Sequence, residues 1–142
     1  MESSCVCTSL RMVTRSVNRL YDHALSKVGM RVTGYSILSR LTEEGPLSIS
    51  QLAGRLAMER TTCTREVAPL LDAGLVEMTT GSDRRVRMLR LTESGARKRE
   101  EAYPLWEEVQ RRLADDFGDT NITVLLERLR RLQASSNRLS QP

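Results

Sequence analysis

Apolar residues recur with a helical period near the start of the chain. Between residues 10 and 28 they stand three or four positions apart, and Gly29 follows the last of them. This spacing predicts a helix that buries one face and ends at the glycine. A second helix is predicted from Thr33, as its N-cap, to about Glu44. The face of the first helix comprises Leu10, Val13, Val17, Leu20, Ala24 and Val28.

Between Leu47 and Leu91 the spacing of the apolar residues changes from a helical to an alternating pattern. Two short helices are predicted first, the earlier with Ser48 and Ser50 as candidate N-caps and the later ending at Gly74. Alternating apolar and polar residues then predict two strands joined by a polar turn. Helix, turn, helix, strand, hairpin and strand in this order are typical of a winged helix-turn-helix. The predicted strands are Leu75–Thr79 and Val86–Leu91.

The C-terminal third is predicted to be helical. Thr92 is a candidate N-cap for a long helix, and Pro104 is expected to kink it. Gly118 and Asp119 interrupt the pattern before a last helix from about Asn121 to Asn137. The predicted inward positions are Ala102, Leu105 or Trp106, Val109, Leu113 and Phe117 in the first of these helices, and Ile122, Leu125, Leu126, Leu129 and Leu132 in the second.

These elements predict a mainly α (α+β) fold, with a winged helix-turn-helix core and dimerisation helices at both ends. The expected organisation is an N-terminal tail and helix over 1–30, the DNA-binding core over 31–92 and C-terminal helices over 93–142, all in one intertwined domain. The terminal helices have little core to pack against in a single chain. A two-fold homodimer would bury their apolar stripes and place two DNA readers side by side. A compact monomer with an extended core is the alternative.

Charge adds a candidate partner. The 142 residues carry a net charge of +4, which favours an anionic partner. Residues 46–91 hold seven arginines against five acids, and four of these arginines lie between Arg84 and Arg90. No apolar run approaches the roughly 20 residues of a membrane helix. Residues 1–8 lack the blocks of a secretion signal, so a cytoplasmic location without membrane attachment is expected.

Residues suited to DNA contact cluster in the second short helix and in the hairpin. A recognition helix lies in the major groove with its N-terminal residues at the base edges. The hydroxyls of the preceding helix can donate to a phosphate, and an arginine-rich hairpin tip can enter a minor groove. The opposite face of the recognition helix, with Val67, Leu70 and Leu71, is expected to pack on the core. The predicted DNA-binding residues are Ser48, Ser50, Arg60, Thr61, Thr62, Thr64, Arg65, Arg84, Arg85 and Arg87.

The chain resembles the MarR family of bacterial winged-helix regulators along nearly its whole length. The resemblance is carried by Leu47–Ala53, Arg60–Arg65 and Leu70–Val76. Its strongest part is Asp83–Gly95, which is similar to the family's wing followed by the Leu-Thr-x-x-Gly opening of its long helix.

The resemblance implies a homodimer joined through its terminal helices that binds double-stranded DNA at a palindromic operator, usually to repress. By position, Arg85 matches the wing arginine that enters the minor groove, and Asp83 its supporting acid. Thr64 and Arg65 match recognition-helix contacts. Pro69 departs from the pattern, because it removes an amide that would bond to the Arg65 carbonyl, and a kink there would re-aim the helix.

Cysteines offer one possible control. Cys5 and Cys7 are expected ahead of the first helix, near Arg11, and Cys63 is expected as a small, partly buried filler in the recognition helix. In the resembling family, some members sense oxidants through N-terminal cysteines. A redox switch at Cys5 and Cys7 and incidental thiols are both compatible with the sequence. A metal site is not expected, because Cys5, Cys7 and His23 lack a ligand spacing.

A small molecule is the other possible control. The resemblance implies an effector, often an aromatic acid or phenolic compound, between the dimer helices and the winged core. Arg15 could pair with the carboxylate of such a ligand, although a plain core is the alternative for the others. The residues predicted to line the cleft are Met12, Arg15, Tyr21, Met30, Tyr35 and Trp106.

Other functional classes have less support. The chain has one histidine, no glycine-rich phosphate loop and no nucleophile–base pair, so neither enzymatic activity nor a cofactor is expected. A winged helix used for protein contact is the remaining alternative. Such a module would not need the arginine cluster, and its binding would tolerate salt, whereas DNA binding weakens steeply as salt rises.

Overall fold

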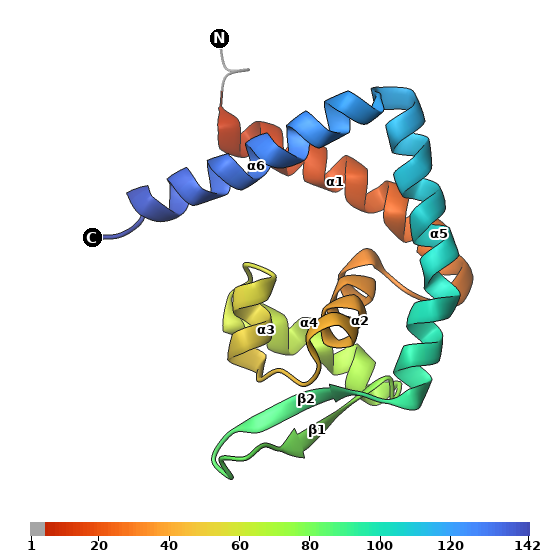
Figure 1. The fold of residues 1–142 in the computed structure, drawn as a ribbon, viewed down its shortest axis with the longest axis vertical. Coiled ribbons are helices and arrows are strands. Elements are labelled where there is room, and N and C mark those ends of the chain that lie inside the picture. Colours follow the sequence, from red (N-terminus) through yellow and green to blue (C-terminus); the bar gives the residue numbers. More distant parts are fainter. Residues whose placement is uncertain (1–4) are drawn as a thin grey trace. The chain divides into compact units, whose positions relative to one another are not determined.

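The computed structural model describes residues 5–142, so residues 1–4 of the predicted N-terminal segment lie outside the described residues. The chain divides into two compact units, Met1–Trp106 and Glu107–Pro142, with the boundary inside helix α5. Helices and a two-stranded wing follow one another in the predicted order, which confirms the mainly helical winged fold (Figure 1). Within residues 5–142, no helix is long and apolar enough to cross a membrane.

Helix α1 spans Val6–Leu25 and continues into a 3-10 turn, η2, at Ser26–Val28. Gly29 ends it in the left-handed conformation with φ of 69°, as the sequence predicts. The helix starts earlier than expected, so Cys5 is its N-cap and Cys7 lies in its first turn. The expectation that both cysteines precede the helix is therefore wrong, because nothing between Val6 and Ser9 breaks it.

Helix α2, Val32–Glu44, packs between α1 and the helix-turn-helix. Its N-cap is Arg31, which offers no side-chain bond. The Val32 amide instead donates to Asp22 Oδ1 of α1 at 2.8 Å, so Thr33 is not the cap. A carboxylate from another helix satisfies a helix amide as well as a local hydroxyl does. This bond ties the start of α2 to the end of α1.

Helices α3, Ile49–Arg55, and α4, Arg60–Asp72, form the helix-turn-helix. Ser48 is the N-cap of α3 in a capping box with Gln51: each side chain accepts a hydrogen bond from the other's amide. The buried face of α4 carries Cys63, Val67 and Leu70. Leu71 is 37% exposed, so its predicted anchoring role is wrong; the buried positions follow the steps 63, 67 and 70.

The turn between α3 and α4 places Ala57 in the left-handed region, with φ of 53°. An alanine there costs roughly 1–2 kcal/mol of backbone strain that glycine avoids. Ala57→Gly is therefore expected to raise the free energy of unfolding by about 0.5–1 kcal/mol, after the entropy that glycine adds to the unfolded chain. Urea denaturation followed by circular dichroism measures the change.

Ala68→Gly is the matched control, because Ala68 is an exposed position inside α4. The same change should lower stability there by about 1 kcal/mol. Equal losses at both positions would show that the turn holds no strain.

The wing is an antiparallel pair of strands, β1 Val76–Thr80 and β2 Arg87–Leu91, with Val76 opposite Leu91 and Thr80 opposite Arg87. Both strands lie within a residue of their predicted bounds. A third partner that was not predicted is Leu47, which forms a bridge to Leu89 on the outer edge of β2. The Leu47 amide donates to the Leu89 carbonyl at 3.1 Å and the reverse bond is 2.7 Å long. The wing is thereby fixed to the start of the helix-turn-helix.

Helix α5 spans Glu93–Phe117 and α6 spans Asp119–Leu139. Thr92 is the predicted cap, since its Oγ1 accepts from the Gly95 amide at 3.0 Å. Pro104 lies within α5, and the helix continues through it. In α6 none of the predicted apolar positions is buried in the single chain.

The buried core belongs to the first unit. Its fully buried side chains come from α1, α2, α3, α4, both strands and, through Ala102, α5; the largest are Leu25, Ile37, Leu38, Leu52, Leu89, Val67 and Val76. The core therefore packs α3, α4 and the wing against one another, and this packing sets the relative positions of the side chains that they present to solvent.

Candidate nucleic-acid interface

Three segments that are distant in sequence meet around one surface hollow of about 540 Å³. The first is the N-terminus of α3, the second is the first residue of α4, and the third is the wing. This convergence brings two hydroxyls and three guanidinium groups together on one face. The lining side chains are Ser48, Ile49, Ser50, Arg60, Met78, Arg85, Val86 and Arg87.

The first turns of α4 present polar and basic side chains to solvent. Arg60, Thr61, Thr64 and Arg65 are exposed, and Thr62 is half-buried. Thr64 Oγ1 donates to the Arg60 carbonyl at 3.0 Å, which leaves its oxygen free to accept a further bond. These residues precede Pro69 in a helix that runs unbroken to Asp72. Pro69 lies nine residues beyond Arg60 and does not line the hollow.

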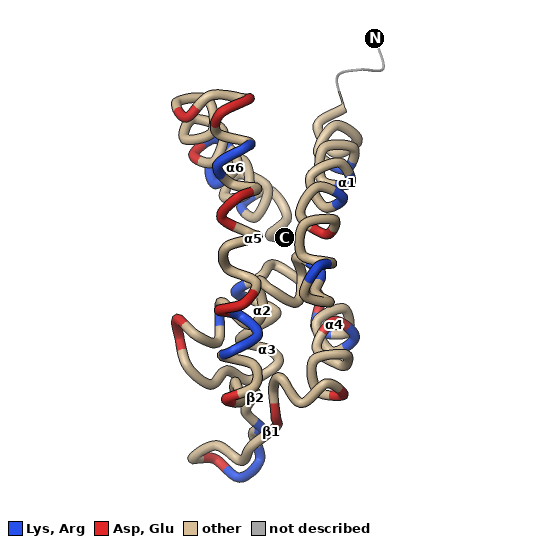
Figure 2. Tube along the Cα trace, turned by 90° about the vertical axis from the view of Figure 1, so that its right-hand side faces the viewer, with Lys and Arg blue, Asp and Glu red and all other residues tan. Residues whose placement is uncertain are grey.

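The wing tip is ordered by an acid and an arginine. The Arg85 amide donates to Asp83 Oδ1 at 3.0 Å, and Arg85 Nε donates to the same oxygen at 3.3 Å. The Arg85 side chain remains 91% exposed, so this pairing orients it without burying it. Figure 2 shows basic and acidic positions side by side at the tip, beyond β1 and β2.

The four hairpin arginines fall into two groups. Arg90 forms an ion pair with Glu77 on the neighbouring strand, so its charge is neutralised within the sheet. Arg85 is paired only at the exposed tip. Among residues 5–142, Arg84 and Arg87 have no carboxylate within 4.0 Å, and both are exposed. Three of the four arginines are thus available to an outside anion.

Ser48 has a local bond as well as a place at the hollow. Its Oγ accepts from the Gln51 amide at 3.1 Å, and its hydroxyl proton remains available for another acceptor. Ser50, the other predicted hydroxyl, is exposed in the first turn of α3. A helix N-terminus with free donors suits an anion such as a phosphate.

The residues predicted to line one effector cleft do not come together within the chain. Tyr35 and Trp106 share a pocket, with ring centroids 5.6 Å apart. Met30 borders a separate hollow beside α4, and Arg15 borders a third along α1. Tyr21 is buried, and Met12 is 61% exposed on α1. The helical spacing of these residues in the sequence indicates which of them share a face of one helix. It does not indicate which helices line the same pocket.

The three cysteines occupy two environments. Cys5 and Cys7 are exposed, whereas Cys63 is fully buried, more than the partial burial expected for it. Hydrogen bonds from the hydroxyl and amide of Thr8 lower the pKa of the Cys5 thiol. Burial, together with the nearby Glu66 carboxylate, raises the pKa of the Cys63 thiol. The expected influence of Arg11 on these thiols is therefore wrong for Cys5, whose pKa is lowered by Thr8.

Comparisons with known proteins agree with this geometry. The sequence pattern of the MarR family matches residues 31–86. The HTH-type transcriptional regulator YwoH of Bacillus subtilis (strain 168) is 27% identical over 111 residues, which are 78% of each chain.

Solved structures extend the likeness along the chain. The M. tuberculosis transcriptional regulator MosR in complex with DNA has a TM-score of 0.88 at 28% identity, covering 97% of this chain and all of that one. Another MosR structure has a TM-score of 0.76 at 30% identity and covers 96% of both chains. A mutant of E. coli MarR complexed with operator DNA shares the fold, with a TM-score of 0.82 at 20% identity over 92% of this chain and 95% of that one. The winged fold, the family match over residues 31–86 and a solved structure that is 30% identical along 96% of the chain together show the family. The chain belongs to the MarR family of winged helix-turn-helix transcriptional regulators.

Proposed function

We propose that this regulator is a repressor that binds a palindromic operator as a homodimer and is released by an effector. The observation that carries the proposal is the hollow where α3, α4 and the wing bring Ser48, Ser50, Arg60, Arg85 and Arg87 together. MosR and E. coli MarR, which share this fold, have been solved with DNA. Membership of a family of regulators confirms the prediction that the chain is not an enzyme.

The chemistry of the hollow suits a DNA duplex. Its serines at the start of α3 can donate to a phosphate, and Arg60 stands where a recognition helix meets base edges. Arg85 extends from the wing with its planar group exposed, and a guanidinium of that kind fits a narrow minor groove. Backbone contacts and base contacts would thus come from neighbouring residues of one surface.

The exposed apolar stripes support a dimer. On α1, Val6, Leu10 and Val13 are 37–56% exposed at four- and three-residue steps. On α6, Leu126 and Leu129 are 44% and 37% exposed. Apolar stripes of this regularity are expected to be covered by another chain. Sedimentation equilibrium is expected to give twice the 16.1 kDa of one chain, and a purely monomeric mass would contradict the proposal.

Fluorescence anisotropy with labelled DNA from upstream of its own gene tests the DNA-binding function. We expect binding that weakens about 10³- to 10⁵-fold between 50 and 200 mM salt if 6–10 phosphates are contacted by the dimer. A scrambled duplex of equal length is the control and should bind more weakly. Salt-tolerant binding, or equal affinity for both duplexes, would contradict the operator model. In vitro transcription from the same DNA then distinguishes repression from activation.

A second candidate function is a redox-responsive regulator, favoured by the exposed Cys5 and its lowered pKa. Peroxide would oxidise the Cys5 thiolate to a sulfenic acid with release of hydroxide, and a second thiol would then form the disulfide with loss of water. Cys5 is the extended N-cap of α1 and Cys7 lies in the first turn of the helix. The second thiol could be Cys7 of the same chain or a thiol of another subunit.

Replacing Cys5 and Cys7 together by serine is expected to abolish any loss of operator binding after peroxide, with reduced-state affinity unchanged. Cys63→Ala is the control and should retain the response, because its buried thiol has a raised pKa. Non-reducing electrophoresis separates an internal disulfide from a cross-linked dimer. A response that survives in the double variant would remove this pair from the mechanism.

The lowered pKa of Cys5 has its own test. With Cys7 and Cys63 replaced, the alkylation rate of Cys5 should rise with pH at a midpoint below that of an ordinary thiol, since the thiolate is the reactive form. Thr8→Val should move the midpoint upward, because it removes the hydroxyl donor. An unmoved midpoint would show that Thr8 does not stabilise the thiolate.

A further inference from the structure

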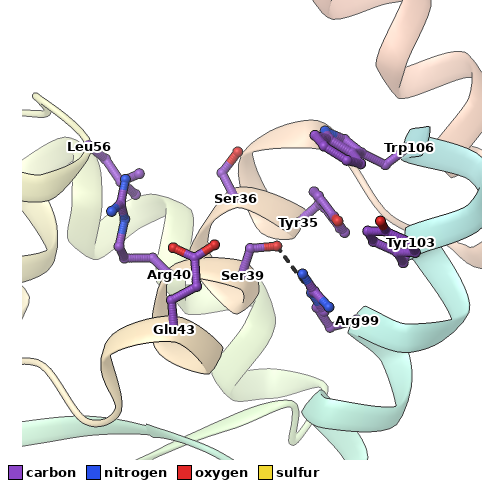
Figure 3. A pocket seen from close by; sticks show the side chains of 9 residues that line it. All are labelled: Tyr35, Ser36, Ser39, Arg40, Glu43, Leu56, Arg99, Tyr103 and Trp106. Atoms are coloured by element: carbon purple, nitrogen blue, oxygen red, sulfur yellow. Dashed lines mark hydrogen bonds between the residues drawn. The ribbon is translucent and has the colours of Figure 1, made fainter. Parts of the chain in front are cut away.

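A small pocket of about 200 Å³ lies in the first unit, lined by the turn after η2, the start of α2 and the second half of α4. An apolar cavity of about 150 Å³ can hold a benzene molecule, so this pocket has room for a compound of roughly six to eight carbon atoms. It shares no residue with the pocket of Tyr35 and Trp106, which Figure 3 shows. Its lining residues are Gly29, Met30, Arg31, Gly34, Glu66, Pro69, Leu70, Ala73 and Leu75.

The floor of this pocket is apolar. Met30, Leu70 and Leu75 line it and are 6%, 7% and 8% exposed. A hydrocarbon group that covers such a surface is favoured, because apolar area is removed from water on both sides of the contact. The floor therefore suits a ligand with an apolar body.

Gly34 keeps part of this space open. It lies inside α2, where glycine is less favourable than alanine, and it is not among the glycines with a positive φ. A Cβ at this position would lie 3.4 Å from Met30 Cε and 3.5 Å from Leu70 Cδ2, which are ordinary van der Waals contacts. Neither the backbone nor the packing of α2 therefore excludes alanine. A methyl group at this position would occupy the space between two residues of the floor.

The charge beside the floor is negative. Glu66 is half-buried at the pocket, and among residues 5–142 no Lys, Arg or His nitrogen lies within 4.0 Å of its carboxylate. Arg31, the other charged residue of the lining, pairs with a different acid. Its Nε lies 3.8 Å from Asp22 Oδ2, and its side chain is 81% exposed. The pair of Arg31 and Asp22 has no net charge, so Glu66 gives the pocket an excess of one negative charge.

The end of α4 adds to this negative potential. The carbonyl groups of a helix's last turn carry partial negative charge, and the last turn of α4 contains no basic residue. Pro69 and Ala73 bring this part of the chain to the pocket. Pro69 also has no amide, so the Arg65 carbonyl lacks its usual helical donor and can accept from another group. A carboxylate, a carbonyl and a helix C-terminus thus all favour a cation here.

We propose that this pocket binds a small hydrophobic amine, with the ammonium group at Glu66 and the hydrocarbon group on the apolar floor. A protonated amine has three donors, which the carboxylate and the neighbouring carbonyl can accept. A carboxylate compound of the same size would be repelled by Glu66. Because Glu66, Pro69 and Leu70 belong to α4, the amine would contact the recognition helix itself. This site goes beyond the proposed function and does not require that the hollow at the wing binds DNA.

Nuclear magnetic resonance of the methionine methyl groups tests the site, because Met30 lines the pocket. The full-length protein, labelled at these carbons, is titrated with hexylamine, hexanol and hexanoate, and Met30→Leu assigns the Met30 signal. We expect a saturable shift of this signal with hexylamine, a Kd several-fold higher for hexanol and no shift with hexanoate. Met58 and Met88 do not line the pocket, so their signals are internal controls and should not move.

Two pairs of variants separate the charge from the floor. Glu66→Gln should raise the Kd of hexylamine about tenfold and leave that of hexanol nearly unchanged. Asp72→Asn is its matched control, an exposed acid of α4 that does not line the pocket, and should change neither Kd. Gly34→Ala should raise both Kd values several-fold, because its methyl group fills part of the floor. Gly54→Ala, in α3 and outside the pocket, should change neither.

A Met30 signal that does not respond to hexylamine, equal affinity for hexanoate, or a Kd unaffected by Glu66→Gln would each overturn the proposal. Circular dichroism of every variant shows whether it is folded. Operator binding by the same protein without amine separates this site from the proposed function. Intact operator binding with an unresponsive pocket overturns only the amine site, whereas absent operator binding overturns the proposed function and leaves the result of the titration valid.

Discussion

Arg85→Ala is expected to weaken operator binding by about 1–3 kcal/mol, roughly 5- to 150-fold, with folding unchanged. The reason lies in how the wing presents this residue. Its backbone amide and Nε both bond to Asp83 Oδ1, while 91% of the side chain remains exposed. The two bonds orient the arginine in the free chain, and alanine removes both the charge and this arrangement. Anisotropy at constant salt measures the loss.

Two further variants test whether the loss of operator binding comes from the oriented arginine or from net charge alone. Asp83→Ala keeps the arginine but removes its acceptor, so it should cause a smaller loss than Arg85→Ala. Arg138→Ala removes an equal charge near the end of α6 and should change operator binding little. If Arg85→Ala folds normally and binds like the wild type, the wing has no part in recognition. An equal loss from Arg138→Ala would indicate a general effect of net charge.

Gly95→Ala is expected to lower the free energy of unfolding by at least about 3 kcal/mol. A Cβ at this position would lie 1.9 Å from the Leu75 carbonyl oxygen and 2.8 Å from Leu91 Cδ1. The first of these contacts is with backbone, which cannot rotate away. The junction between the wing and α5 would have to open, and the Thr92 cap would open with it. Urea denaturation of the two proteins measures the difference.

Gly54→Ala is the matched control for this prediction. Gly54 also lies inside a helix, α3, and a Cβ there would meet no atom within 4 Å. Alanine should raise stability at this position by about 0.5–1 kcal/mol through its better helix propensity. Opposite signs for the same substitution would attribute the loss at Gly95 to the close approach. A stable Gly95→Ala protein would contradict the packing of α5 on Leu75.

Much of the fold follows from local patterns in the sequence. The N-cap at Ser48, the glycine that ends η2 and the cap at Thr92 are all short-range features that the sequence predicts, and the structure adds that Gln51 completes a capping box with Ser48. The features that were missed depend on tertiary contacts. Asp22 caps α2 from another helix, and Leu47 bridges to Leu89 across 42 positions. No local spacing indicates such partners.

The two sites differ in the same way. The surface where α3, α4 and the wing meet could be predicted, because a recognition helix and a wing have fixed places in the chain; its contacts with DNA stay a prediction. The pocket beside α4 could not, because Glu66 stands in the run Thr64-Arg65-Glu66, which is typical of a solvated helix face. Only the packing of α4 on α2 places that carboxylate at one pocket with Met30 and Gly34. Sequence gives the period of a helix but not its neighbour.

The junction at Thr92 joins the wing to the base of α5 through three hydrogen bonds. Thr92 donates its amide to the Leu75 carbonyl at 3.1 Å and its hydroxyl to the Gly74 carbonyl at 2.7 Å, while its oxygen caps α5. A rotation of the first turns of α5 must therefore carry the end of β2 with it or break these three bonds. In a dimer, a few degrees of tilt would change the span between two wings, and an operator of fixed helical repeat would no longer fit both.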